Sequence, residues 1–151
     1  MRRASLNSLP ELFLGYKYTE ELCWVIECII REVRPLAVIL FGSLAKGDYH
    51  EKSDADLCVI LDCESVHPLA RPVPVEPCNP DGIAEAQAFG AAEFKKMLKD
   101  ANGLALEIMH YGLLLAGDES FIAELEKLFE EVKEEWGLEK TPTGWKAHRL
   151  Q

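Results

Sequence analysis

The sequence predicts a single α+β domain in which a small mixed β-sheet is flanked by helices. Short β-branched apolar runs at 36–41 and 55–61 have the length and composition of buried strands. Segments 19–33 and 120–136 repeat apolar residues at the spacing of amphipathic helices. These two periodicities in one chain indicate helices packed on a sheet.

The domain organisation follows from the length. A chain of 151 residues is long enough to bury one real core. We assign the whole chain, 1–151, to one domain, with a core at about 19–118 and a C-terminal helix and tail at about 119–151.

The first predicted helix and strand have clear boundaries. Thr19 is an expected N-cap with acidic residues in the turn that follows, and Pro35 ends the helix. The strand at 36–41 is closed by Gly42-Ser43, where a short helix is expected to begin at Ser43.

The later elements are predicted in the same way. A polar loop, 47–53, separates the two buried strands. Residues 63–80 hold five prolines, which allows only a short edge strand there. The predicted elements beyond the second strand are an edge strand at Val73–Glu76, helical patterns around 84–99 and 104–111, a strand or turn at 112–116, a helix at 120–136 that Gly137 stops, and an irregular tail.

The charge of the chain limits its partners. A formal net charge of −10 argues against extensive non-specific nucleic-acid binding, which needs a basic face. The longest apolar runs are strand-sized, so we expect no membrane span, and no apolar signal segment follows Met1-Arg2-Arg3.

Five cysteines are an odd number, and none has Cys-x-x-Cys spacing. We therefore expect neither a zinc site nor a disulfide framework. Cys23, Cys28 and Cys58 fall in apolar patterns and are predicted to be small core residues. This cysteine usage predicts a reducing, cytoplasmic location.

Asp54 and Asp56 open the second buried strand. Their side chains are two residues apart and therefore point from the same face, with Cα atoms about 6.6 Å apart. Two carboxylates in this arrangement can share a hard divalent cation such as Mg²⁺. Without a cation, their like charges would raise the pKa of one of them.

Gly42 and Ser43 close the neighbouring strand. Glycine lets a phosphate approach the backbone, the serine hydroxyl can donate to a phosphate oxygen, and the helix that follows offers free N–H groups. Lys46, one helical turn on, is expected to supply positive charge, with help from Lys52 or Arg71. We expect phosphates and metal to meet at the carboxyl ends of neighbouring strands.

Each pair alone has an ordinary interpretation, because an Asp-x-Asp pair is often a turn or a helix cap and a Gly-Ser pair is often only a turn. Their combination, with an apolar strand before the first pair and another after the second, indicates a site for a nucleoside triphosphate. The stretch from Ile39 to Leu57 resembles the minimal nucleotidyltransferase family of the DNA polymerase β superfamily. That resemblance implies a palm-like mixed sheet flanked by helices and transfer of a nucleoside monophosphate from a triphosphate.

The resemblance also implies Mg²⁺, with Mn²⁺ as the alternative, held by three carboxylates. On this basis Asp54, Asp56 and Glu76 are the expected catalytic and metal-binding residues. Gly42, Ser43 and Lys46 are the expected nucleotide-binding residues. Glu107 is the alternative to Glu76 as the third carboxylate.

The predicted function is therefore Mg²⁺-dependent transfer of a nucleoside monophosphate from an NTP, with ATP favoured, to a hydroxyl of a protein or a small molecule. The alternative is an antitoxin or regulatory module that acts mainly by binding a partner, with weak or no turnover. The resemblance implies a helical toxin protein as that partner. The oligomeric state is left open.

Overall fold

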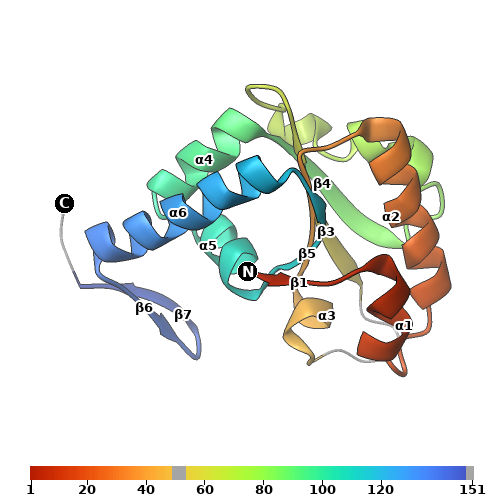
Figure 1. Cartoon of the computed structure of the whole chain (residues 1–151), viewed down its shortest axis with the longest axis horizontal. Helices are drawn as coiled ribbons and strands as arrows, with labels where there is room; N and C mark the ends of the chain where they lie inside the picture. Colours follow the sequence, from red (N-terminus) through yellow and green to blue (C-terminus); the bar gives the residue numbers. More distant parts are fainter. Residues whose placement is uncertain (49–53, 149–151) are drawn as a thin grey trace.

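The computed structural model describes residues 1–48 and 54–148 of the chain. It contains a five-stranded sheet and a separate two-stranded hairpin (Figure 1). The strands are β1 (Arg2–Arg3), β2 (Ala37–Phe41), β3 (Ala55–Leu61), β4 (Ala84–Gly90), β5 (Leu113–Gly117), β6 (Leu138–Thr141) and β7 (Gly144–Ala147). The helices are η1 (Leu6–Ser8), α1 (Leu9–Leu12), α2 (Thr19–Val33), α3 (Ser43–Lys46), η2 (Pro68–Ala70), η3 (Val73–Cys78), α4 (Ala91–Lys99), α5 (Gly103–Tyr111) and α6 (Glu119–Trp136), where η denotes a 3₁₀ helix.

The strand order is β1–β5–β2–β3–β4, and the sheet is mixed. β2 runs antiparallel to both β3 and β5, whereas β1–β5 and β3–β4 are parallel pairs. The predicted α+β class and mixed sheet are confirmed.

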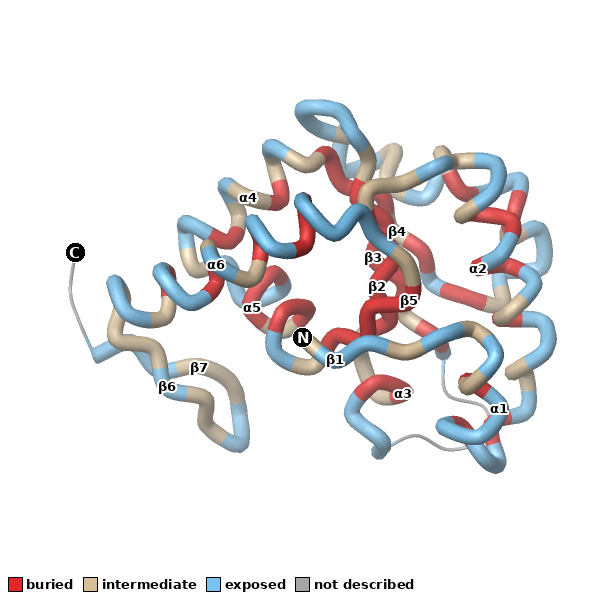
Figure 2. The backbone as a smooth tube through the Cα atoms, viewed as in Figure 1, coloured by how far each residue is buried: buried red, intermediate tan, exposed pale blue. Residues whose placement is uncertain are grey.

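Helices cover both faces of the sheet. α1, α2 and η3 pack on one face, while α4, α5 and α6 pack on the other (Figure 1). Side chains of β2 and β3 alternate between the two clusters, so that Val38 and Leu57 join the first and Ile39 and Cys58 the second. Figure 2 shows the buried residues gathered along the central strands and the inward sides of the helices. Among the described residues, no helix has the length and apolar character needed to cross a membrane.

The helix predicted at 19–33 is confirmed as α2, although its N-cap is Tyr18 and not Thr19, which is the first helical residue. It ends at Arg34, whose left-handed φ of 51° turns the chain out of the helix immediately before Pro35. The right-handed helical region is sterically disfavoured for a residue that precedes proline, which accounts for the end of the helix at this point.

The region between β3 and α5 differs from the sequence prediction in two places. The expected strand at Val73–Glu76 is wrong, because these residues begin η3, where closely spaced prolines cannot supply ladder donors. The expected helix at 84–99 is wrong in its first half, which forms β4. In β4, buried Ala84, Ala86 and Ala88 alternate with more polar residues, and this period of two prevails over the helical preference of alanine. The expected irregular tail is also wrong, since it forms the β6–β7 hairpin.

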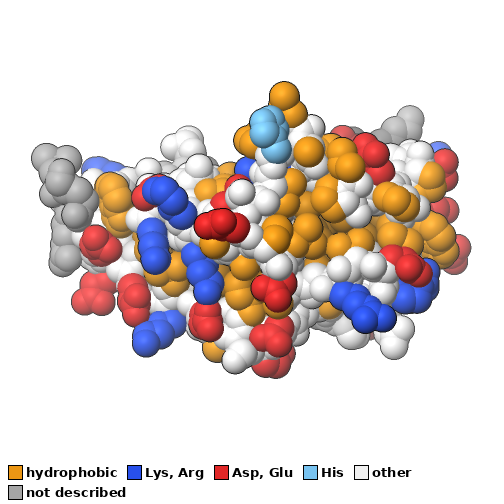
Figure 3. All heavy atoms as spheres, turned by 90° about the horizontal axis from the view of Figure 1, so that it is seen from above, with side chains coloured by type: hydrophobic (Ala, Val, Ile, Leu, Met, Phe, Trp, Pro, Cys, Tyr) orange, Lys and Arg blue, Asp and Glu red, His pale blue; other side chains and the backbone are white. Residues whose placement is uncertain are grey.

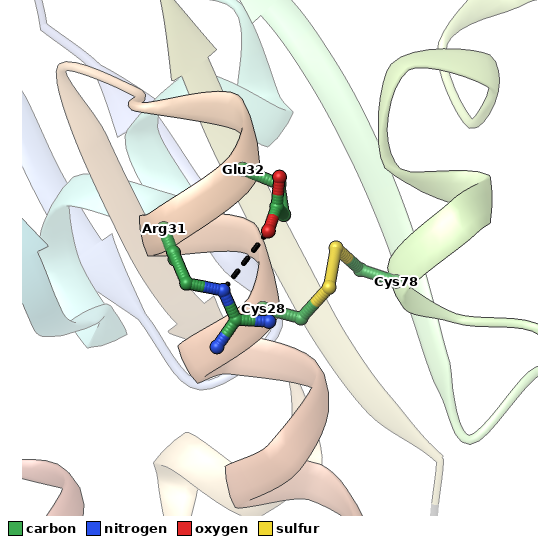
Figure 4. Close-up of a disulfide and its surroundings, with 4 residues drawn as sticks. All are labelled: Cys28, Arg31, Glu32 and Cys78. Atoms are coloured by element: carbon green, nitrogen blue, oxygen red, sulfur yellow. Dashed lines mark hydrogen bonds and ion pairs between the residues drawn. A yellow bond between two sulfur atoms is a disulfide. The ribbon is translucent and has the colours of Figure 1, made fainter.

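A disulfide joins Cys28 of α2 to Cys78 at the end of η3 (Figure 4). The Cα atoms of the two cysteines are 5.5 Å apart, and the bond encloses a sequence separation of 50 residues. Cys28 is buried in the core, as predicted, but its sulfur is bonded to that of Cys78, so the expectation of no disulfide was wrong for this pair. No spacing rule could find this pair, because the packing of η3 on α2 brings the two cysteines together.

Candidate active site

The turn after β2 brings the backbone of Gly42 against the carboxylate of Asp56. Gly42 has a φ of 78°, and a Cβ atom there would lie 2.1 Å from Oδ2 of Asp56. That distance is sterically impossible, so any side chain at this position would displace the carboxylate. Ser43 follows as the first residue of α3, and N–H groups at the start of a helix have no intrahelical acceptor. The Gly-Ser turn therefore combines backbone donors with an adjacent carboxylate.

The strand register places Asp56 at the centre of this group. Asp56 pairs with Phe41 across β2–β3 and with Glu85 across β3–β4. Because β3 runs antiparallel to β2, the carboxyl end of β2 meets the amino ends of β3 and β4. The expectation that the site lies at the carboxyl ends of neighbouring strands was wrong in this respect.

The charge state of Asp56 reflects its surroundings. Burial, followed by the negative charges of Glu85 and Asp54, raises the pKa of Asp56 from an ordinary value of 3.8 to about 6. Both causes disfavour the ionised carboxylate, and a cation bound to it would relieve both. The repulsion expected between Asp54 and Asp56 is present, with Glu85 as an additional negative charge.

The raised pKa makes the stability of the metal-free protein depend on pH. The folded state binds the Asp56 proton more tightly than the unfolded state does, so this stabilisation is fully present below pH 3.8 and is lost as the pH rises through about 6. After discounting for partial exposure, we expect the wild type to lose about 1 kcal/mol more stability than Asp56→Asn between pH 4 and pH 7. Urea denaturation in EDTA at several pH values measures this difference. Parallel stability curves for the two proteins would contradict the assignment.

Glu85 is a candidate site residue that sequence reasoning missed. It is exposed, it lies in register with Asp56, and its charge raises the pKa of Asp56. The available signal was the alternation Ala84-Glu85-Ala86-Gln87, which has the period of a strand. Assigning this segment to a helix removed Glu85 from consideration.

The two other glutamates considered for the third carboxylate come from α5 and η3. Glu107 projects from α5 toward α3, where its Oε1 is 2.5 Å from Nζ of Lys46. Lys46 also lies 4.9 Å from the centroid of the Tyr111 ring. The hydrogen bond to Glu107 raises the pKa of Lys46, so this lysine is held as a cation close to the Gly-Ser turn. Glu76 lies on η3 and is exposed.

Arg71 does not have the role expected for it. Its guanidinium forms two hydrogen bonds to Glu93, of 2.9 and 3.1 Å, and packs 4.1 Å from the centroid of the Phe89 ring. A guanidinium neutralised in this way is a poor partner for phosphate. Lys52, the other expected source of positive charge, lies outside the described residues.

The oxygen ligands around Asp56 fit a hard divalent cation. Within the described ranges 1–48 and 54–148, no three His, Cys, Asp or Glu side chains form a ready-made metal cluster. Asp54, Asp56 and Glu85 are nevertheless charged neighbours, because burial and then the negative charges of Glu85 and Asp54 raise the pKa of Asp56. These three residues could hold a divalent metal.

Comparison with known families decides the class of the protein. The family model of the nucleotidyltransferase domain matches residues 22–128. The chain belongs to this family. The match contains the Gly-Ser turn, both aspartates and Glu85, and it confirms the predicted resemblance and the assignment to nucleotidyltransferase enzymes. Nucleotidyltransferases generally use divalent metals.

Solved structures provide a second comparison. A structure described as a toxin–antitoxin with AMP-PNP is 18% identical, with 75% of this chain and 90% of that chain covered and a TM-score of 0.48. Two mutants of the toxin–antitoxin MntA–HpeT have identities of 16% and 15% and TM-scores of 0.47. They cover 75% and 78% of this chain and 89% and 91% of their own chains. No curated protein matches this nucleotidyltransferase.

Proposed function

We propose that this nucleotidyltransferase moves a nucleoside monophosphate from an NTP, with ATP favoured, to a hydroxyl of a protein or a small molecule. Mg²⁺ is the proposed metal, with Mn²⁺ as the alternative. The observation that carries the proposal is the contact between Gly42 and Asp56, which leaves no room for a Cβ atom. A phosphate that reaches the backbone of this turn is thereby placed beside the carboxylates.

Residues of this chain are proposed to bind the triphosphate, the departing pyrophosphate and the metal. Gly42 and Ser43 bind the β- and γ-phosphates through backbone N–H groups and the serine hydroxyl. Lys46 exchanges part of its interaction with Glu107 for the departing pyrophosphate. Asp54, Asp56 and Glu85 would hold the divalent metal, which would neutralise charge on the triphosphate. Glu85 takes the role first expected of Glu76, because it is aligned with Asp56.

Nucleotide binding and transfer are tested together. We expect titration calorimetry to detect Mg²⁺-dependent binding of ATP, and α-phosphate-labelled ATP to transfer its label to an acceptor among candidate proteins and hydroxyl compounds. Asp54→Asn/Asp56→Asn is expected to remove transfer, because the metal ligands are lost. Asp62→Asn, at the opposite end of β3, is the matched control and retains both activities.

A second candidate function, partner binding with weak or no turnover, is favoured by one surface observation. Trp24, Leu69 and Val73 are 53%, 88% and 54% exposed. Figure 3 shows hydrophobic side chains gathered over the half of the molecule that carries α2 and the segments before β4. Exposed apolar surface of this kind often binds another protein. In this second proposal the partner is a helical toxin protein, and the two proteins meet in the cytoplasm.

The same experiment separates the two candidates. One outcome is that a partner binds tightly to both the wild type and Asp54→Asn/Asp56→Asn, and that no label is transferred from any of the four common NTPs. This outcome would support the binding module and contradict the proposed nucleotidyl transfer. Label transfer that requires the two aspartates would establish the enzyme.

A further inference from the structure

A pocket of about 420 Å³ lies along the free edge of β4, on the side away from β3. Its walls come from β4 and from the segment 68–79, which contains η2 and η3. Glu85 lines this pocket and is also in register with Asp56. Glu85 therefore belongs both to the pocket and to the candidate active site.

The outer edge of β4, which faces this pocket, is only partly hydrogen-bonded. Ala84 is bonded at both its N–H and its C=O by the Asn79 side chain. Ala88 is bonded in the same way by the backbone and side chain of Arg71. Because backbone groups alternate along a strand, the N–H and C=O of Ala86 point to the same edge.

Ala86 is only 5% exposed, and no described residue forms a hydrogen bond with its outward N–H or C=O. A buried, unpaired backbone donor and acceptor are costly unless a ligand or water satisfies them. Both groups face the pocket between the positions occupied by Asn79 and Arg71. They offer one donor and one acceptor to whatever enters it.

The charges of the pocket select the kind of ligand. Arg71 is the cation of its lining, and its guanidinium is neutralised by Glu93. Glu76 and Glu85 are exposed carboxylates, and Glu76 is not one of the proposed metal ligands. The pocket is therefore net acidic, which disfavours phosphate groups and favours ammonium or guanidinium groups and hydroxyl donors.

The geometry of phosphoryl transfer assigns a direction to the pocket. The attacking and leaving oxygens lie roughly in line on opposite sides of the phosphorus. With pyrophosphate held at Gly42 and Ser43 beyond β2, and the metal ligands at the start of β3, the attacking hydroxyl enters from the β4 side. Neighbouring strands are about 4.8 Å apart. Two such spacings, about 10 Å in total, separate β2, where the pyrophosphate is held, from β4, where the hydroxyl enters.

We propose that the β4-edge pocket binds the acceptor, and that the acceptor is a hydroxyl compound bearing an ammonium or guanidinium group. This inference rests on the proposed function and names its substrate class. The acceptor oxygen attacks the α-phosphorus, the bond from that phosphorus to the bridging oxygen of pyrophosphate breaks, and pyrophosphate leaves. The hydroxyl proton is released to solvent. Glu76 binds the cationic group, and Ala86 orients the acceptor through its backbone.

Paired probes test this pocket directly. Acetyl-Lys-Ser-Lys-amide is compared with acetyl-Glu-Ser-Glu-amide, and glucosamine with glucose, by following the backbone amide NMR signals of Ala86 and Gln87. We expect saturable shifts with the cationic member of a pair, at an affinity about tenfold above that of its counterpart. A preference confined to the peptide pair assigns a polypeptide acceptor, and one confined to the sugar pair assigns a small molecule.

Variants of Glu76 separate charge recognition from general disruption. Glu76→Gln is expected to lower affinity for the cationic probe about tenfold, and Glu76→Lys to reverse the preference between the two peptides. Glu131→Gln, on the exposed side of α6, is the matched control and keeps the wild-type preference. Circular dichroism confirms that each variant is folded. Equal binding of both members of each pair, or binding that ignores Glu76, overturns the assignment.

Titration with ATP and Mg²⁺, read at the amides of Gly42 and Ser43, distinguishes the two proposals. If these amides respond but no cationic probe reaches Ala86, the acceptor assignment is wrong and the proposed function stands. If a cationic probe fills the pocket while ATP neither binds nor reacts, the proposed function is wrong and the acceptor role is overturned with it.

Discussion

Glu85→Gln is expected to slow nucleotidyl transfer by about 10³-fold, because the variant loses a metal ligand. ATP binding at the Gly-Ser turn should persist, since Gly42 and Ser43 are unchanged. The effect should therefore fall on kcat rather than on KM for ATP. Steady-state transfer of α-phosphate label, with ATP and acceptor varied separately, measures the two constants.

The other two glutamates provide the comparison for Glu85. Glu107→Gln frees Lys46 and should change KM for ATP more than kcat, because the 2.5 Å ion pair between these residues is lost. Glu76→Gln should raise KM for a cationic acceptor. A loss of about 10³-fold in kcat at either position, with Glu85→Gln near wild type, would return the third-carboxylate role to that residue.

Removing the Cys28–Cys78 bond is expected to lower the free energy of unfolding by about 4 kcal/mol, because the unfolded chain regains the entropy of a loop of 50 residues. This is a large fraction of the stability of an ordinary domain. Guanidinium denaturation of the wild type, with and without reductant, and of Cys28→Ser/Cys78→Ser measures the loss. Cys63→Ser, which replaces an exposed free thiol, is the control.

Thiol counting checks the premise of that prediction. Without reductant, the denatured protein should expose three reactive thiols, those of Cys23, Cys58 and Cys63. Five thiols, or a reductant that leaves the unfolding curve unchanged, would show that the bond does not form. The prediction of a reducing, cytoplasmic location depends on the same measurement, because disulfides rarely persist in that compartment.

Part of the candidate site was predictable because its signals are local. Gly42 and Ser43 end one apolar run, and Asp54 and Asp56 begin the next. Both runs formed the expected strands, β2 and β3, and the two strands are paired. No short segment of the sequence indicates that the two strands are antiparallel. The prediction that the two ends of the site lie together was therefore based on the wrong strand ends, because the carboxyl end of β2 meets the amino end of β3.

Glu85 shows why the rest was harder to predict. In its segment, alanine favours a helix while the alternation of buried and polar residues favours a strand, and the pairing of Ala84–Gly90 with β3 decides between them. The Val73–Glu76 prediction failed in the opposite way. Its β-branched residues favoured a strand, but the prolines left it unable to join the sheet edge.

The sequence by itself determined the family, the α+β class, the two amphipathic helices and the pairing of a Gly-Ser turn with Asp54 and Asp56. These features are written in the spacing of residues that are close along the chain. Only the tertiary structure decided that Glu85 joins Asp56, that Glu107 holds Lys46, and that Cys28 meets Cys78. Each of these contacts joins separate elements and depends on strand register and helix packing, which result from the folding of the whole chain.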